Sequence, residues 1–270
     1  MSFRFGCNTL YPHGRLPREE NAFDLKAHRE SLALIRGCGF DGCEFSHYQH
    51  LAPAEQSALR AACAELGLTP WSAHSWVPLP GAVANVAASL PKLHASLEGA
   101  ARLGVSVMVL HAAGGEPDDR RAALGQTLRD LAPAAAKVGI TLAIENCSVR
   151  ADLEFLIETV DALALPAVGF NCDTGHAAIH GMTPAEVIRL MGHRLVTTHM
   201  QDNFGQRDDH LPPGKGTIDW VATRDALLEV GYQGIFMVEI SDCPPGREPL
   251  PKEDTQAAHD FLRPLFAAKA

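Results

Sequence analysis

The sequence lacks the features that would place it in a membrane or in an oxidising compartment. Its 270 residues contain no apolar run that approaches the roughly 18 residues of a membrane-spanning helix. The opening stretch, MSFRFGCNTL, has no charged start followed by an apolar segment, so no secretory signal is predicted. The seven cysteines are scattered, without a CxxC pair. We therefore expect a cytoplasmic protein with reduced thiols and no membrane partner.

A basic run is also lacking. The chain carries 23 Lys and Arg residues against 32 Asp and Glu residues, which gives a formal net charge of −9. Proteins that hold nucleic acid through phosphate contacts concentrate positive charge on one face or along one helix. The composition therefore argues against a nucleic acid partner.

The chain instead alternates short apolar runs with longer amphipathic, alanine-rich stretches. Runs this continuous in Val, Ile, Leu and Phe are typical of parallel strands that are buried on both faces. The expected strands are Phe3–Cys7, Gly42–Phe45, Pro70–His74, Val105–His111, Ile140–Glu145, Ala167–Asp173, Leu195–His199 and Ile235–Ile240. The helices expected between them include Ala84–Leu103, Asp118–Val138, Ala151–Leu163 and Trp220–Val230.

Eight strand–helix units would use the whole chain, since 270 residues divided by eight gives about 34 residues per unit. We predict an α/β protein with a single (β/α)8 TIM barrel domain over residues 1–270. A doubly wound open sheet is the alternative. That fold usually places a glycine-rich phosphate-binding turn after its first strand, and Cys7-Asn8-Thr9-Leu10 is not such a turn.

Polar residues stand where successive predicted strands end, about one strand–helix unit apart. They are His74, His111, Glu145, Asp173, His199 and Glu239. In a barrel, the C-terminal ends of the strands converge on one mouth, where the active sites of this fold lie. Carboxylates brought this close would repel one another and lose solvation unless a cation lies among them. The spacing therefore predicts a divalent metal site.

The predicted ligands of one metal ion are Glu145, Asp173, His199 and Glu239. Three carboxylates with one imidazole suit Mn²⁺, Co²⁺ or Mg²⁺, and Zn²⁺ remains open. Taken singly, each residue could equally cap a loop or fill the core. The prediction depends on the four residues occurring in register.

Two neighbouring stretches extend this site. Strand alternation places Asn171 and Asp173 on one face of their strand and Cys172 on the other, so Cys172 is expected to pack in the core. His176 then starts the following loop, within reach of the mouth. The polar, Gly- and Pro-rich loop after the seventh strand has the composition of a segment that covers substrate, with Asp219 as the cap of the next helix. A solvated surface loop is the alternative.

These motifs resemble the xylose isomerase-like TIM barrel superfamily, in particular its sugar phosphate isomerase/epimerase branch. The matching stretches are AIEN at 143–146, NCDTGH at 171–176, HMQDN at 199–203, DHLPPGKGTIDW at 209–220 and VEI at 238–240. The resemblance implies a metal-dependent isomerase or epimerase that acts on a small sugar or hydroxy-keto compound. It leaves the substrate itself open. Dimers and tetramers are common in this family, so a homo-oligomer is implied as well.

The family's ketose epimerases imply a role for each matching residue. Glu145, Asp173, His199 and Glu239 would hold one divalent metal ion. Glu145 and Glu239 would also be the catalytic pair, one removing a proton from the substrate carbon and the other returning it through a cis-enediolate. His176 matches a family histidine that contacts substrate oxygens.

One position departs from the epimerase pattern. The family's epimerases carry an arginine in the loop after the seventh strand, and the matching position here is His210; Arg207 lies nearby but out of register. We expect His210 to contact substrate, with His74 and His111 binding substrate hydroxyls at the rim. Trp76 is expected to form an apolar wall for the sugar.

Two other activities remain open on the same site. The endonuclease IV-like branch of the superfamily binds three zinc ions through histidines after strands 3 and 4 and an Asp-x-His in the loop after strand 7. His74, His111, Asp208 and His210 stand at the matching places, which would suit phosphodiester cleavage by a metal-activated water. The acidic balance disfavours a DNA substrate. A metal-dependent dehydratase or lyase of a polyol or keto acid is the second alternative.

Overall fold

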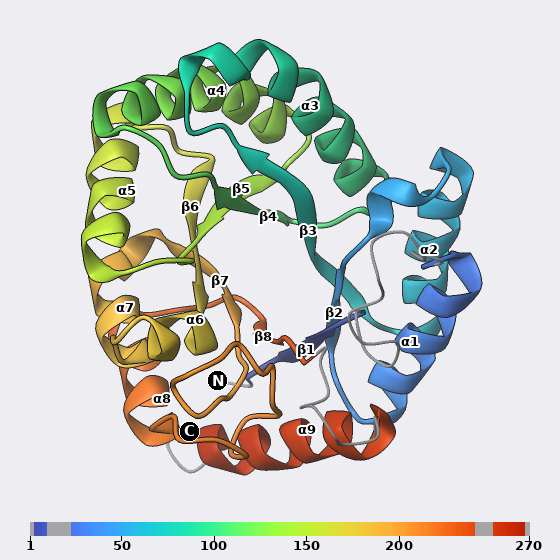
Figure 1. Ribbon diagram of the computed structural model, residues 1–270. Helices are drawn as coiled ribbons and strands as arrows, with labels where there is room; N and C mark the ends of the chain where they lie inside the picture. The colour runs from blue at the N-terminus through green and yellow to red at the C-terminus, as the bar shows by residue number, and fades with distance from the viewer. Residues whose placement is uncertain (1–2, 10–22, 241–250, 268–270) are drawn as a thin grey trace.

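The computed structural model describes residues 3–9, 23–240 and 251–267. Within these ranges, eight parallel strands form one sheet at the centre of a ring of helices (Figure 1). The strands are β1 (Phe5–Asn8), β2 (Gly42–Phe45), β3 (Thr69–Leu79), β4 (Val107–Ala112), β5 (Thr141–Glu145), β6 (Val168–Asp173), β7 (Leu195–His199) and β8 (Phe236–Val238). The predicted (β/α)8 barrel is confirmed.

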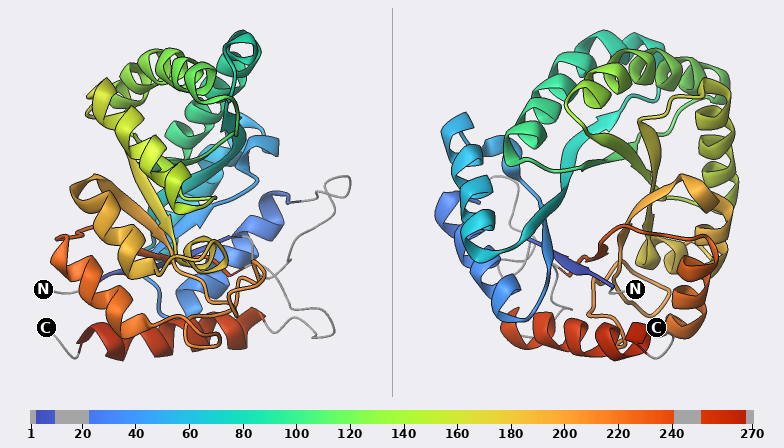
Figure 2. Two further views of the ribbon diagram at one scale, coloured as in Figure 1. Left: turned by 60° about the vertical axis from the view of Figure 1, so that its left-hand side comes forward. Right: turned by 180° about the vertical axis from the view of Figure 1, so that it is seen from behind.

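Helices follow the strands and cover the outside of the barrel on all sides, as the two views of Figure 2 show. They are α1 (Leu25–Gly37), α2 (Pro53–Leu66), α3 (Val86–Leu103), α4 (Pro117–Lys137), α5 (Arg150–Leu163), α6 (Thr174–Ile179), α7 (Pro184–Met191), α8 (Trp220–Glu229) and α9 (Pro251–Ala267). The described residues also include the short 3-10 helices η2 (Tyr48–His50), η3 (Val83–Asn85) and η4 (Gly192–Arg194), which lie between these elements. Among the described helices, none has both the length and the apolar composition needed to cross a membrane.

The sheet has the strand order β7-β6-β5-β4-β3-β2-β1-β8, and its two edges meet just beyond β7. Met200 forms an isolated parallel bridge with Val238. Its backbone N–H donates to the Met237 carbonyl at 2.7 Å, and its own carbonyl accepts from the Glu239 N–H at 3.2 Å. These bonds nearly close the barrel, and they place His199 and Glu239 next to each other.

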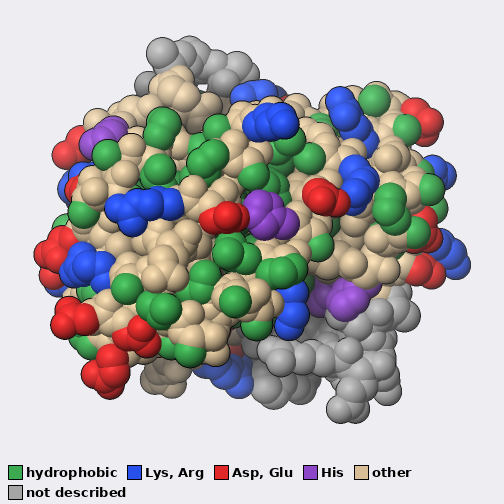
Figure 3. Space-filling model, turned by 90° about the horizontal axis from the view of Figure 1, so that it is seen from above, with side chains coloured by type: hydrophobic (Ala, Val, Ile, Leu, Met, Phe, Trp, Pro, Cys, Tyr) green, Lys and Arg blue, Asp and Glu red, His purple; other side chains and the backbone are tan. Residues whose placement is uncertain are grey.

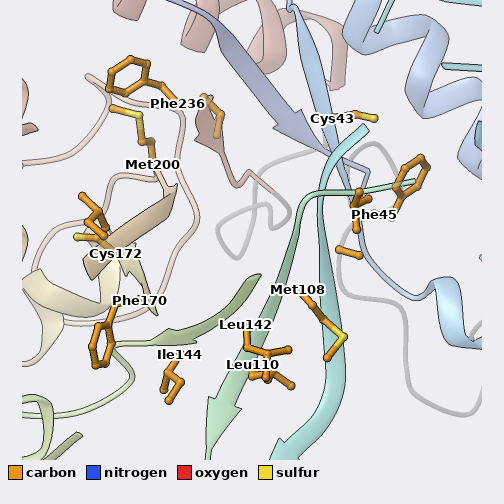
Figure 4. Close-up of a cluster of buried hydrophobic side chains, with 14 of the residues drawn as sticks. Cys43, Phe45, Met108, Leu110, Leu142, Ile144, Phe170, Cys172, Met200 and Phe236 are labelled. Atoms are coloured by element: carbon orange, nitrogen blue, oxygen red, sulfur yellow. The ribbon is translucent and has the colours of Figure 1, made fainter. Parts of the chain in front are cut away.

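The main hydrophobic core lies between the outer face of the strands and the helices. Figure 4 shows its side chains on successive strands, among them Phe45, Leu142, Phe170 and Cys172. Cys172 is fully buried in this core, as its place in the strand predicts. The six described cysteines are free thiols, and Cys243 lies outside the described residues.

An aromatic cluster joins the last helix to the first strand. The Phe266 ring of α9 lies 5.5 Å from that of Phe5 in β1 and 4.5 Å from that of Phe236 in β8. Phe3 adds a further edge contact to Phe266 at 5.4 Å. Buried aromatic pairs of this kind stabilise beyond the area they remove from water. The cluster therefore packs α9 against the outer face of the paired strands β1 and β8.

The interior of the barrel is divided into an apolar bottom and a polar top. Val107, Val109 and Ala143 form a small buried cluster at the bottom, against which Trp71 packs. Because side chains alternate along a strand, the inward-facing position after Val109 in β4 belongs to His111. The same alternation puts polar residues at the C-terminal end of the neighbouring strands, which is the mouth of the barrel.

The main differences from the expected boundaries are at two strands and one loop; β1, β4, β5 and β6 are shifted by one or two residues, and β2 and β7 have the expected bounds. β3 continues to Leu79 instead of ending at His74, because Leu79 pairs with Ala112 of β4 beyond a register shift. β8 is only three residues long and ends before Glu239. His176 lies in helix α6, not in a loop.

On the face shown in Figure 3, acidic and basic side chains are interspersed.

Candidate metal centre

The four predicted metal ligands meet at the mouth of the barrel. Glu145, Asp173 and His199 are the last residues of β5, β6 and β7, and Glu239 directly follows β8. Their exposed fractions are 1%, 0%, 0% and 4%. Groups of this polarity are buried only at a large cost in solvation unless they are paired or coordinate a cation.

The Nδ1 atom of His199 is the centre of this group. It lies 3.0 Å from Glu145 Oε2, 2.9 Å from Glu239 Oε2 and 4.0 Å from Asp173 Oδ2. Three carboxylates from three different strands thus point toward one imidazole nitrogen. The arrangement is what the spacing of the strand ends predicts.

Glu145 connects the metal-ligand group to two further histidines. Its Oε1 lies 3.2 Å from His111 Nε2 and 3.0 Å from His176 Nδ1. Its Oε2 accepts a hydrogen bond from Asn171 Nδ2 at 2.7 Å. Asn171 lies two residues before the end of β6, on the inward face. This contact fixes the orientation of the Glu145 carboxylate.

Asp173 has a structural role in addition to its place at the mouth. It is the N-cap of α6, and its Oδ1 accepts from the His176 N–H at 2.7 Å. Gly175, in the first turn of α6, leaves room for the Gln201 side chain, because a Cβ at this position would lie 2.2 Å from it and would displace it. The Asp-Thr-Gly-His sequence thus places Asp173 and His176 on the same side of the mouth.

The loop between β7 and α8 brings Asp208 and His210 to the same mouth. His176 Nε2 lies 3.4 Å from Asp208 Oδ2, and His210 Nε2 lies 3.5 Å from Asp208 Oδ1 and 3.7 Å from Glu239 Oε2. Arg207 instead pairs with Asp209 and is more than half exposed. His210, not Arg207, therefore faces the site from this loop.

His74 and His111 form the other side of the mouth. Their Nε2 atoms are 3.1 Å apart, and His74 Nδ1 lies 3.9 Å from Glu239 Oε1. The indole of Trp76 stacks near His74, with ring centroids 6.1 Å apart, and is 48% exposed. Trp76 therefore presents an accessible aromatic surface beside the two histidines.

The buried charges shift one another's pKa values. Burial favours the neutral carboxyl, but the neighbouring imidazoles outweigh it and hold the pKa of Glu145 well below its usual range. The same balance, with His199 as the main partner, lowers the pKa of Glu239 to about 2. Burial, together with the adjacent carboxylates, raises the pKa of Asp173 to about 7. Binding a metal ion to such a site displaces protons from the imidazoles, so affinity should increase with pH.

A divalent cation fits the residues at the mouth. Among the described residues, the buried Nδ1 atoms of His74 and His199 have no hydrogen-bond partner of acceptable geometry, although carboxylate oxygens surround them. The groups whose ligand atoms lie within 4.8 Å of one another include Glu145–Asp173–His199, His74–His111–Glu145 and Asp173–His210–Glu239. Convergent lone pairs on mixed oxygen and nitrogen donors are the chemistry of a Mn²⁺, Co²⁺, Mg²⁺ or Zn²⁺ site.

Two buried carboxylates near the site were not singled out in the sequence. Glu44, the third residue of β2, accepts a hydrogen bond from His199 Nε2 at 3.0 Å. Asp202 accepts hydrogen bonds from the Gly214 N–H at 2.9 Å and the Trp220 Nε1–H at 2.8 Å, and so organises the β7–α8 loop. Glu44 could have been predicted as a residue near the site, because it stands near the end of an apolar strand. Asp202 lies in the HMQDN stretch at 199–203, but nothing in that stretch predicts its hydrogen bonds to Gly214 and Trp220.

A buried set of carboxylates and imidazoles lies at the mouth of a (β/α)8 barrel, which is where the active sites of this fold are found. The chain belongs to the family described as xylose isomerase-like TIM barrel, which matches residues 32–265.

Individual relatives and solved structures are similar to the chain. An uncharacterized protein of Methanocaldococcus jannaschii is 32% identical over 42% of the chain and 41% of its own length. The D-psicose 3-epimerase of Enterocloster bolteae is 29% identical over 44% of the chain and 40% of its own length. The matched segments thus span about two fifths of these relatives. A crystal structure of a D-tagatose 3-epimerase-like protein has a TM-score of 0.80 and 21% identity, covering 98% of both chains.

Proposed function

We propose that this protein is a divalent-metal-dependent isomerase or epimerase of a small sugar or hydroxy-keto compound. The observation that carries the proposal is the placement of Glu145 and Glu239. Their carboxylates come from β5 and β8, on different sides of the barrel, and both lie within 3.0 Å of His199 Nδ1. The similarity to named sugar epimerases supports the same class of reaction.

The two glutamates suit a proton transfer at a substrate carbon. One carboxylate removes the proton beside the carbonyl, and the other returns it through a cis-enediolate. Carboxylates on two sides of the substrate allow delivery to either face, which is what epimerisation requires. Asn171 holds the Glu145 carboxylate in place through its 2.7 Å hydrogen bond.

Glu145, Asp173, His199 and Glu239 would hold the metal ion: the first three have ligand atoms within 4.8 Å of one another, and Glu239 Oε2 lies 2.9 Å from His199 Nδ1. A bound divalent cation at this point supplies a Lewis acid that polarises the carbonyl and favours the enediolate. His176 and His210, which face the same space, are placed to hydrogen-bond substrate oxygens, with His74 and His111 at the rim. Trp76 offers an apolar surface on which a sugar ring can pack. The proposed partner is therefore a small carbohydrate-like molecule.

Deuterium exchange tests this function directly. The Mn²⁺- or Co²⁺-loaded protein is incubated in D₂O with a panel of unphosphorylated and phosphorylated ketoses, and carbon-bound deuterium is followed by NMR. We expect incorporation next to the carbonyl for at least one substrate class, with an epimeric product. Absence of exchange across a broad panel, with metal bound, would rule out the proton-transfer mechanism.

A multinuclear zinc hydrolase is a second candidate, and one observation favours it. His74 and His111 approach Glu145 as a second potential ligand group, and Asp208 lies between His176 and His210 as a third. More than one cation could be held by this set, and a metal-activated water would then suit phosphodiester cleavage.

Metal content and DNA cleavage distinguish the two candidates. One metal ion per chain, measured by elemental analysis after dialysis, supports the isomerase. Two or three zinc ions per chain, together with efficient cleavage of an abasic duplex, would favour the hydrolase.

A further inference from the structure

Glu44 is a fully buried carboxylate that lies beneath the mouth on the β2 side of the barrel. Its Oε2 accepts two hydrogen bonds, one from Ser72 Oγ at 2.7 Å and one from His199 Nε2 at 3.0 Å. Both Glu44 and His199 have an exposed fraction of 0%. The contact crosses the barrel from β2 to β7 and joins residues 155 positions apart.

The burial of Glu44 is costly and is only partly compensated. Among the described residues, its second oxygen, Oε1, has no hydrogen-bond partner. A buried carboxylate loses its hydration and regains free energy only through the partners it finds in the protein. Ser72 and His199 are its hydrogen-bond donors, so the position of the Glu44 carboxylate is matched to the His199 ring.

The hydrogen bond to Glu44 determines what the other nitrogen of His199 can do. A neutral imidazole carries one proton, and the nitrogen that donates a hydrogen bond leaves the other nitrogen with a free lone pair. Donation from Nε2 to Glu44 therefore directs the lone pair of Nδ1 toward Glu145, Asp173 and Glu239. Carboxylate partners of this kind also raise the basicity of a ligating imidazole.

We propose that Glu44 is a positioning residue that fixes the Nε2–H tautomer and the ring orientation of His199, so that Nδ1 is presented to a divalent metal ion. The inference rests on the metal centre of the proposed function. Ser72 holds the Glu44 carboxylate in turn, which gives the sequence of contacts Ser72, Glu44, His199 and then the cation.

Metal affinity of substituted proteins tests this role. Mn²⁺ and Zn²⁺ binding to the full chain is measured by calorimetry for the wild type, Glu44→Ala and Glu44→Gln. Loss of a carboxylate that supports a ligating histidine typically lowers metal affinity about 10- to 100-fold. We expect a loss in this range for Glu44→Ala and a smaller loss for Glu44→Gln, whose amide oxygen can still accept from Nε2. The matched control is Ser46→Ala, a buried polar change two residues further along the chain, which should leave the affinity unchanged.

The protonation of His199 gives a readout that a purely structural role would not change. In protein labelled with ¹⁵N-histidine and loaded with Zn²⁺, NMR should show His199 with Nε2 protonated and Nδ1 bound to the metal. Zinc on Nε2 in the wild type would overturn the inference, even if the Glu44 variants fail to fold.

The two failures can be told apart. A wild-type protein that binds no divalent metal removes the metal centre and this inference together. A wild type that binds metal, with folded Glu44 variants that bind it equally well, removes only the role of Glu44.

Discussion

At the scale of single residues, the two oxygens of Glu145 face different neighbours. Oε1 is directed toward His111 and His176, and Oε2 toward His199 and Asn171. A carboxylate held from four sides cannot rotate without breaking contacts. Its geometry is thus set before a substrate arrives, and this preorganisation is what a proton-transferring group needs.

Substitution of either glutamate that we propose as catalytic should remove the proposed reaction without unfolding the protein. Glu145→Gln and Glu239→Gln keep the side-chain volume but remove the proton acceptor. We expect solvent deuterium exchange to fall about 10²- to 10⁴-fold, the usual contribution of a general base. The control is Glu98→Gln, an exposed carboxylate on α3 paired with Arg102. Exchange at wild-type rates in either variant would contradict the assigned roles.

His47 should make stability depend on pH. Its ring lies 5.3 Å from that of Phe23 and 4.6 Å from that of Trp76, and burial lowers its pKa to about 4. Because the unfolded chain binds this proton more readily, the stabilisation is complete above pH 6.5 and is lost as pH falls through 4.

The His47 effect can be isolated by substitution. Asparagine tolerates the left-handed backbone of this residue, whose φ is 58°. In urea unfolding, the decrease in the free energy of unfolding between pH 7 and pH 4.5 should be about 2 kcal/mol smaller in His47→Asn than in the wild type. The exposed His193→Asn serves as the control. Equal pH dependence of all three proteins would contradict the prediction.

At the scale of elements, the side chain of Asp202 accepts four hydrogen bonds that connect distant parts of the β7–α8 loop. Asp202 Oδ1 accepts from the N–H groups of Asn203 and Ile218, and Oδ2 accepts from Gly214 N–H and Trp220 Nε1–H. The loop carries Asp208 and His210 to the mouth. The loop must therefore keep this conformation for Asp208 and His210 to lie at the mouth of the barrel.

Asp202→Asn should loosen this loop. The amide nitrogen would face two N–H donors in place of an acceptor, at a cost of about 1–3 kcal/mol. We expect faster amide hydrogen exchange across residues 203–219, with β7 itself still protected. The exposed Glu229→Gln at the end of α8 should leave exchange in the loop unchanged. Unaltered exchange in Asp202→Asn would show that other contacts hold the loop.

The sequence predicts the bounds of a strand or helix well when neighbouring residues determine them, and poorly when contacts with distant residues do. β2 and β7 have the predicted bounds because apolar runs and flanking polar residues define them. The extension of β3 depends on pairing with β4, and α6 depends on the cap at Asp173; neither leaves a clear local pattern. The residues at the strand ends can be predicted because a barrel brings equivalent positions of successive strands together.

The hydrogen bond between Glu44 and His199 cannot be predicted in this way, because it joins residues 155 positions apart in the sequence.

At the scale of the whole molecule, metal binding should stabilise the fold. The proposed ligands lie at or just after the ends of four strands, so the unfolded chain has no formed site. A bound cation at 100 times its dissociation constant would add about 2.7 kcal/mol to the free energy of unfolding. For a chain of this size we expect the Tm to rise by about 5–10 °C when Mn²⁺ is restored to chelator-treated protein. The increase should be smaller in Glu239→Gln, and an equal increase would contradict the predicted ligand set.

The closure of the barrel at β8 has a consequence for synthesis. The N-terminus leaves the ribosome first during synthesis, so β8 and Glu239 are among the last parts of the barrel to be made. The contact of Phe266 in α9 with Phe5 in β1 also forms last. A nascent chain that stops before β8 carries Glu145, Asp173 and His199 but lacks Glu239, the third carboxylate of the predicted ligand set. The proposed metal site, which needs all four residues, would then be complete only in the finished barrel.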